Sequence, residues 1–85
     1  LSIMPDSNML LIPHENKPSM VAKVAQIIGE KGININSMQV NNDTKSQNNE
    51  SIMILNVPCE VKDDVIQKLN QIDGVKSSKY IKLSV

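Results

Sequence analysis

The sequence predicts an α+β fold of the ferredoxin-like type, with the element order βαββαβ in a single small domain of eighty-five residues. Two observations predict it. Short apolar segments of strand length alternate with two longer segments in which apolar residues recur at helical spacing. Both helical segments also run into a glycine, the residue that most often ends a helix.

The first half of the chain predicts a strand, a helix and a second strand. Residues 8–13 form a short apolar run of strand length. Residues 18–31 are predicted as a helix, because Pro18 suits the first helical turn and Gly32 provides a stop. Residues 33–41 then follow as the second strand. The apolar face of the helix comprises Met20, Val21, Val24, Ile27 and Ile28.

The second half repeats this pattern after a polar connection. Residues 42–49 are polar and read as a hairpin loop, and residues 50–57 follow as the third strand. Residues 60–71 are predicted as the second helix, which ends near Gly74. Residues 75–83 complete the set as the fourth strand.

Right-handed crossovers arrange these strands in one antiparallel sheet in the order 4-1-3-2, with both helices on one face and the second strand at an edge. His14 then lies at one end of the sheet and Asn34 at the other, since a strand spans about 17–20 Å. One small ligand cannot contact both residues of one copy. It can do so if two edge strands pair antiparallel across a two-fold axis, which would also close an exposed edge.

Composition disfavours several classes of function. The net charge is zero, and all nine basic residues are Lys, so neither a basic nucleic-acid surface nor an Arg clamp for phosphate is present. Tyr80 is the only aromatic residue, which leaves the central strands without a platform for stacking bases. No apolar run approaches the roughly 20 residues of a membrane span. We expect a cytoplasmic protein without nucleic-acid or membrane partners.

Neither catalysis nor metal binding is expected. Cys59 is the only cysteine, which excludes an internal disulfide and fits a reducing compartment. Cys59 and His14 could pair as nucleophile and base, but the predicted topology separates them by a strand length. One His and one Cys also cannot form a tetrahedral metal site. We therefore expect a non-catalytic domain without a cofactor of its own.

The turn between the first strand and the first helix is the most informative segment. It holds His14 and Asn16, whose side chains can form hydrogen bonds, next to a helix N-terminus that can hold a small anion. From the residues alone, ordinary turn chemistry is the favoured interpretation, with a ligand site as the alternative. Two further surfaces also stay open to two interpretations. The small residues Ala22, Ala25 and Gly29 suit either solvent or a second helix, and the uncovered sheet face suits either solvent or another domain.

Four segments in this order resemble the ACT domain family, most closely the C-terminal regulatory domains of D-3-phosphoglycerate dehydrogenases. They are residues 14–18, 27–35, 38–40 and 72–75, and the resemblance covers about residues 8 to 83. It implies a regulatory domain over residues 8–85, preceded by a linker or tail at residues 1–7. It further implies binding of an amino acid, typically L-serine as feedback inhibitor, with NAD confined to the parent enzyme.

The resemblance also implies where the effector binds. Two copies would pair as a homodimer through the edge strand and the first helix, with the effector held by His14 and Asn16 of one copy and Asn34 of the other. Ser19 stands where the family usually has Gly, so it either narrows the pocket or adds a hydrogen bond. Two alternatives remain: the ACT domain of a bacterial L-serine dehydratase, and a dimerisation module that has lost ligand binding.

Overall fold

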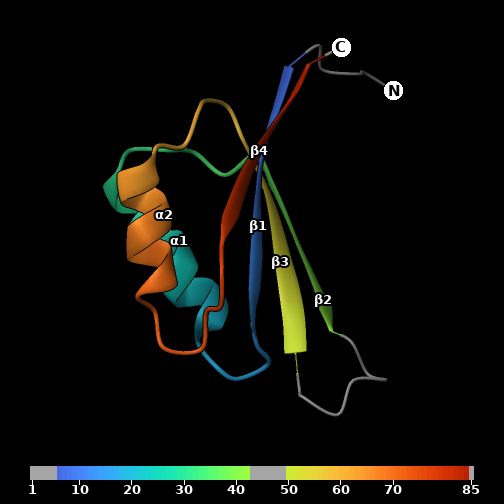
Figure 1. The fold of residues 1–85 in the computed structure, drawn as a ribbon, viewed down its shortest axis with the longest axis vertical. Coiled ribbons are helices and arrows are strands. Elements are labelled where there is room, and N and C mark those ends of the chain that lie inside the picture. The colour runs from blue at the N-terminus through green and yellow to red at the C-terminus, as the bar shows by residue number, and fades with distance from the viewer. Residues whose placement is uncertain (1–5, 43–49, 85) are drawn as a thin grey trace.

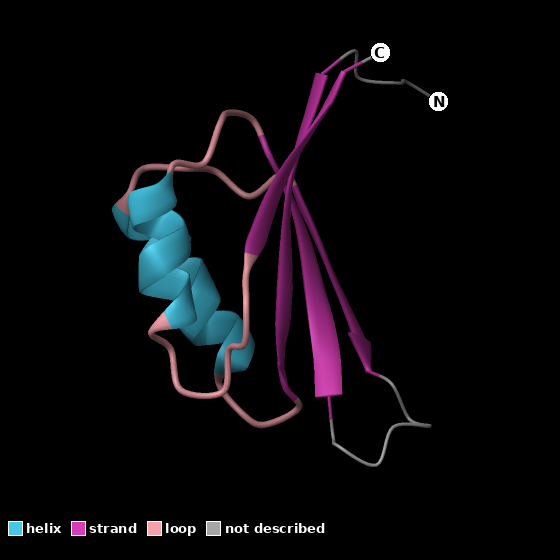
Figure 2. Cartoon of the chain, viewed as in Figure 1, coloured by secondary structure: helices cyan, strands magenta, loops and turns pink. Residues whose placement is uncertain are grey.

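A computed structural model describes residues 6–42 and 50–84 and shows the predicted α+β plan. Four strands form one antiparallel sheet in the order β2-β3-β1-β4, and both helices cover the same face (Figures 1 and 2). The ferredoxin-like topology and the 4-1-3-2 order are therefore confirmed. The elements are β1 (Asp6–Glu15), α1 (Met20–Glu30), β2 (Ser37–Asn42), β3 (Glu50–Val57), α2 (Asp63–Asn70) and β4 (Lys79–Ser84).

The bounds of β3 agree with the prediction, whereas β1 is longer than predicted at both ends. It pairs with β4 from Asp6 onward and with β3 as far as Glu15. A strand with a neighbour on each side keeps its backbone groups satisfied beyond the apolar run that marks it in the sequence. As a result, His14 belongs to the end of β1 rather than to the turn that follows it.

The two edge strands are shorter than predicted. The segment 33–36 runs from α1 back to the sheet, so β2 begins at Ser37 instead of residue 33. Similarly, β4 begins at Lys79, although Val75 forms an isolated bridge to His14. Both helices also start two or three residues later than predicted, at Met20 and Asp63. Most of the predicted polar loop, residues 43–49, lies outside the described residues.

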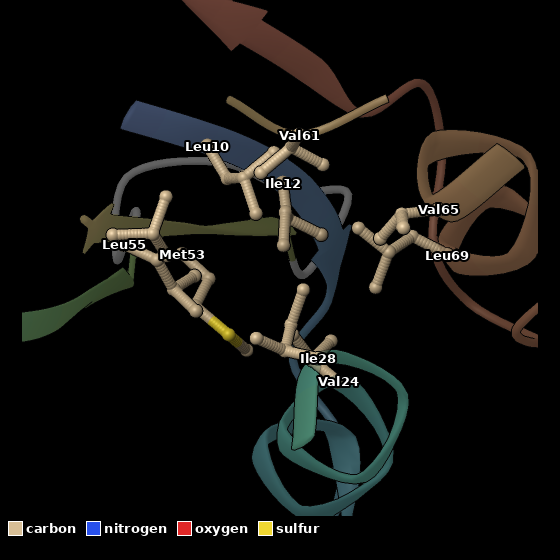
Figure 3. Close-up of a cluster of buried hydrophobic side chains, with 10 residues drawn as sticks. Leu10, Ile12, Val24, Ile28, Met53, Leu55, Val61, Val65 and Leu69 are labelled. Carbon is tan, nitrogen blue, oxygen red and sulfur yellow. The ribbon is translucent and has the colours of Figure 1, made fainter. Parts of the chain in front are cut away.

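The core is aliphatic and lies between the helices and the two central strands. Alternate residues of each central strand face the helices, so β3 shows a strict alternation of buried and partly exposed positions. Side chains from both helices meet this face (Figure 3). The fully buried members of the cluster include Leu10, Ile12, Val24, Ile28, Met53, Leu55 and Leu69.

Gly74 fastens the end of β1 to the segment that follows α2. Its carbonyl accepts a hydrogen bond from the Glu15 amide at 2.8 Å, and the Lys76 amide donates to the Pro13 carbonyl at 2.9 Å. Gly74 has φ +99, and a Cβ atom built there would lie 2.7 Å from Cε of Lys17. The backbone conformation therefore calls for glycine at this position, and a Cβ atom would also require the end of the Lys17 side chain to shift.

Ser19 immediately precedes α1 in a left-handed conformation, with φ 73 and ψ 4. It is the only residue other than glycine with positive φ among the described residues. Its hydroxyl makes no capping hydrogen bond to the helix, so nothing local compensates the conformation. This backbone geometry gives a second physical reason, beside close approach of a ligand, for glycine to suit this position.

We expect Gly74→Ala to lower the free energy of unfolding by more than about 1–2 kcal/mol, the cost of a left-handed conformation for an L-residue. Chemical denaturation measures the change. The matched control is Gly32→Ala, because Gly32 has φ +73 but a Cβ there meets nothing within 4 Å. An equal loss in both variants would mean that the contact with Lys17 imposes no constraint.

Ser19→Gly is expected to stabilise the protein by roughly 0.5–1 kcal/mol, because relief of the left-handed conformation outweighs the added freedom of glycine in the unfolded chain. In a domain of this size that raises the melting midpoint by about 2–8 °C. Ser19→Ala is the control, since it keeps the Cβ atom and should show no such gain. A rise with Ala equal to that with Gly would contradict the explanation.

Candidate functional site

His14 is a buried polar residue at the end of β1. It follows Leu10 and Ile12 at intervals of two, so it faces the helices as they do, and only 3% of it is exposed. Its Nδ1 lies 2.8 Å from the Glu15 carbonyl oxygen. Because a carbonyl can only accept, Nδ1 carries a proton, and in the neutral form of the ring Nε2 is then an acceptor.

Nε2 of His14 is buried and has no hydrogen-bond partner in the structure. An unsatisfied buried group of this kind costs about 1–3 kcal/mol relative to a satisfied one. The nitrogen therefore favours any small molecule that brings an N–H or O–H group to it. A carboxylate, which only accepts, is not the complement of this atom.

The N-terminus of α1 follows within a few residues. Its first amides, those of Met20, Val21 and Ala22, have no acceptor within the helix, and the first turn contains no acidic residue. The positive end of the helix dipole is thus free of a protein carboxylate and favours a bound anion. Together with His14, this end of the fold offers one acceptor and a set of donors.

Lys17 does not compete for the anion, because carboxylates already surround it. Its Nζ lies 3.0 Å from Asp73 and 3.4 Å from Glu15. The hydrogen bond that Lys17 donates to the Asp73 carboxylate raises the pKa of Lys17 and lowers the pKa of Asp73. Lys17 therefore ties the turn before α1 to the segment after α2, which fixes the backbone on which the candidate site stands.

The four predicted site residues divide into two groups. His14, Asn16 and Ser19 lie together where β1 passes into α1, with Asn16 and Ser19 exposed. Asn34 is also exposed, but it lies at the opposite end, where its amide donates to the Asn36 side chain at 3.0 Å.

The sheet register gives the separation. His14 pairs with Ser51, whereas the Asn36 amide bonds to the carbonyl of Asn56, five residues further along β3. Five strand residues span about 17 Å. One copy of the chain therefore does not bring Asn34 to the other three residues, as expected from the topology.

Two further polar residues stand beside His14 and were not among the predicted site residues. Ser51 on β3 is 5% exposed, and its hydroxyl donates to the side chain of Asn42 on β2. A signal for Ser51 was present in the sequence, because it precedes Met53 and Leu55 at intervals of two and so occupies a buried-face position. The identity of its partner Asn42 depends on the strand register, which the sequence does not show.

Cys59 is exposed and free, and it follows the end of β3 that pairs with Asn8 rather than with His14. Within residues 6–42 and 50–84, no three His, Cys, Asp or Glu side chains are grouped so that they could hold a metal ion. Over the same residues, no helix has the length and apolarity needed to cross a membrane.

Comparisons with known proteins point to one family. The family model of the ACT domain matches residues 9–74. D-3-phosphoglycerate dehydrogenase of Methanocaldococcus jannaschii is 35% identical over 98% of this chain, and that of Bacillus subtilis is 28% identical over the same share. The chain spans only 16% and 15% of the length of these two relatives.

A solved structure shares the fold. The ACT domain from GTP pyrophosphokinase of Chlorobium tepidum superposes with a TM-score of 0.65 at 18% identity, covering 89% of this chain and 96% of that one. The similarity at this identity concerns the fold alone. The family match over residues 9–74 and the shared βαββαβ sheet together show that the chain belongs to the ACT domain family.

Proposed function

We propose that this ACT domain is the amino-acid sensor of a D-3-phosphoglycerate dehydrogenase, and that it binds L-serine between two copies to exert feedback control. The observation that carries the proposal is the buried, unpartnered Nε2 of His14 next to an α1 N-terminus without acidic residues. An acceptor and a set of backbone donors at the same end of the fold complement the ammonium and the carboxylate of an amino acid.

The chemistry of L-serine fits this arrangement. Its carboxylate suits the free amides of the first turn of α1, whose dipole favours negative charge. Its hydroxyl or ammonium group supplies the donor that Nε2 of His14 lacks. Asn16 and, from the second copy, Asn34 can each donate and accept, and the Ser19 hydroxyl stands at the helix start. These four residues are the effector-binding residues of the proposal.

Exposed apolar side chains support a homodimer through α1 and the edge strand β2. Val21 of α1 is 41% exposed and Val40 of β2 is 40% exposed. Val40 faces the helix layer, because it pairs with the buried Met53. These two valines therefore offer an apolar surface along the β2 side of the molecule.

The charges near α1 agree with a dimer interface on the same side of the molecule. Lys17 and, to a smaller extent, Lys23 lower the pKa of Asp73 after α2, which agrees with Lys23 lying on the α2 side of α1. Val21 and Ala25 lie two residues from Lys23 on the opposite flank of the helix, away from α2. Ala25 and Gly29 on that flank are small enough for a second helix to approach closely.

The parent enzyme is proposed from the relatives. The curated relatives that match nearly the whole chain are D-3-phosphoglycerate dehydrogenases, and the family model that matches this chain is that of the ACT domain. NAD and the substrate would then belong to other parts of a cytoplasmic enzyme. In this proposal the domain does no chemistry, and it acts by biasing the catalytic part through an allosteric coupling between distinct sites.

We expect L-serine to raise the melting midpoint of the protein. A ligand that binds only the folded state at 100 times its dissociation constant adds about 2.7 kcal/mol, and each kcal/mol raises the midpoint of so small a domain by about 4–8 °C. A thermal melt with and without L-serine measures the shift. L-alanine, which lacks the hydroxyl, should produce a smaller one.

Asn34→Ala should reduce this shift while the dimer persists in sedimentation experiments, because Asn34 reaches the ligand from the other copy. The matched control is Gln67→Ala, an exposed amide residue on α2 that lies outside the proposed site. An unchanged shift in Asn34→Ala would refute the site assignment. Absence of any shift with the unmodified protein would refute serine sensing and favour a pure dimerisation module.

A further inference from the structure

One transverse row of the sheet differs from the rows beside it. Three directly paired residues, Asn42 on β2, Ser51 on β3 and His14 on β1, cross the sheet side by side on the face that the helices cover. All three are polar, and two of them are buried, with His14 3% and Ser51 5% exposed. Over the same three strands the next two rows are apolar and comprise Val40, Met53 and Ile12, then Met38, Leu55 and Leu10.

The position of this row at the rim of the hydrophobic core does not explain why its residues are polar. Polar residues at the rim of a sheet normally reach water, but His14 and Ser51 do not. Burying a hydroxyl and an imidazole is costly unless both are satisfied, and Nε2 of His14 is not. The row therefore has the character of a site that is incomplete without a further molecule.

The hydrogen bonds within this row leave two acceptor atoms available to a ligand. The Ser51 hydroxyl donates its single proton to Oδ1 of Asn42, so its oxygen lone pairs remain available. The Nδ1 proton of His14 is directed to the Glu15 carbonyl, which leaves the Nε2 lone pair. Directly paired residues have Cβ atoms about 4.5–5.5 Å apart, so these two acceptors are neighbours on one face.

The position of the row relates it to the proposed effector site. The strand order places β3 and then β2 between His14 and the edge at which a second copy would pair. Neighbouring strands lie about 4.8 Å apart, so three spacings, roughly 14 Å, separate β1 from the β2 strand of the second copy. In such a pair, an amino acid held between His14 and Asn34 of that copy would lie near Ser51 and Asn42.

We propose that Ser51 is a further effector-contacting residue, whose oxygen accepts a hydrogen bond from a donor group of the bound amino acid beside Nε2 of His14, and that Asn42 positions its hydroxyl. This inference rests on the proposed function, because it assumes that an amino acid binds across two copies. The donor is either the ammonium or the hydroxyl of the effector, and both present N–H or O–H groups to the same two acceptors.

The test is isothermal titration of L-serine into the protein and its Ser51→Ala variant. Loss of the hydrogen bond weakens binding by roughly 3- to 10-fold if the donor is the hydroxyl, and by more than about 10-fold if it is the ammonium. We expect that loss in a variant that remains folded at the temperature of the titration, as a thermal melt of the free protein shows. Ser51→Cys provides a second variant of nearly equal volume that replaces the oxygen by a weak acceptor, and it should show a similar loss.

Ser78→Ala is the matched control. Ser78 is a second buried serine, 6% exposed, whose hydroxyl has no partner, but it precedes β4 and is not part of the row. Its removal should leave serine affinity unchanged. Titration of L-alanine then identifies the donor: equal losses for both ligands in Ser51→Ala indicate the ammonium, and a loss for L-serine alone indicates the hydroxyl.

The outcomes separate the two proposals. If L-serine binds the unmodified protein and His14→Ala abolishes binding, but both Ser51 variants bind normally, the role of Ser51 is refuted while serine sensing stands. A loss in Ser78→Ala equal to that in Ser51→Ala would also refute it, because the effect would then be one of general packing. If the unmodified protein does not bind L-serine, both proposals fail.

Discussion

The pairing of β1 on both sides is the constraint on which the rest of the structure depends. β1 is bonded to β3 over eight residue pairs and to β4 over six, and its last residues are fastened further by Gly74 and Lys76. Because the strand is held to its end, His14 is fixed beneath the helix layer instead of moving with the turn. The same pairing sets where α1 starts, and so where its free amides point.

The topology was predictable because each helix and strand has a clear local signal in the sequence. The first residues of several of these elements were not predictable. Alternating apolar residues and the glycines after both helices suffice for the order of elements and the sheet. The start of β2 was misplaced because Ile33 and Ile35 alternate with Asn like a strand, yet they serve to pack the connection from α1 against the core. The early start expected for β4 has a similar cause, since Val75 makes a single bridge without continuing the ladder.

The candidate site was predictable in part. His14 and Asn16 stand in a segment whose resemblance to ACT domains is visible in the sequence, and the topology alone separates them from Asn34. The burial of His14 and the absence of a partner for its Nε2 were not predictable. They depend on the last residue pairs between β1 and β3 and on the hydrogen bond between Nδ1 and the Glu15 carbonyl. Ser19 was noted as a departure from the family, but its left-handed backbone appears only in three dimensions.

Placing the ligand across two copies has an energetic consequence. If the effector contacts His14 of one copy and Asn34 of the other, its binding energy is available only in the paired state, so ligand and dimer stabilise each other by equal amounts. The row from His14 through Ser51 to Asn42 carries the polar surface of the site to the edge of β2, where the second copy would pair. A sensor built in this way reports occupancy as a change in how firmly two chains are held together. In the proposed function, that change is the signal to the catalytic part of the parent enzyme.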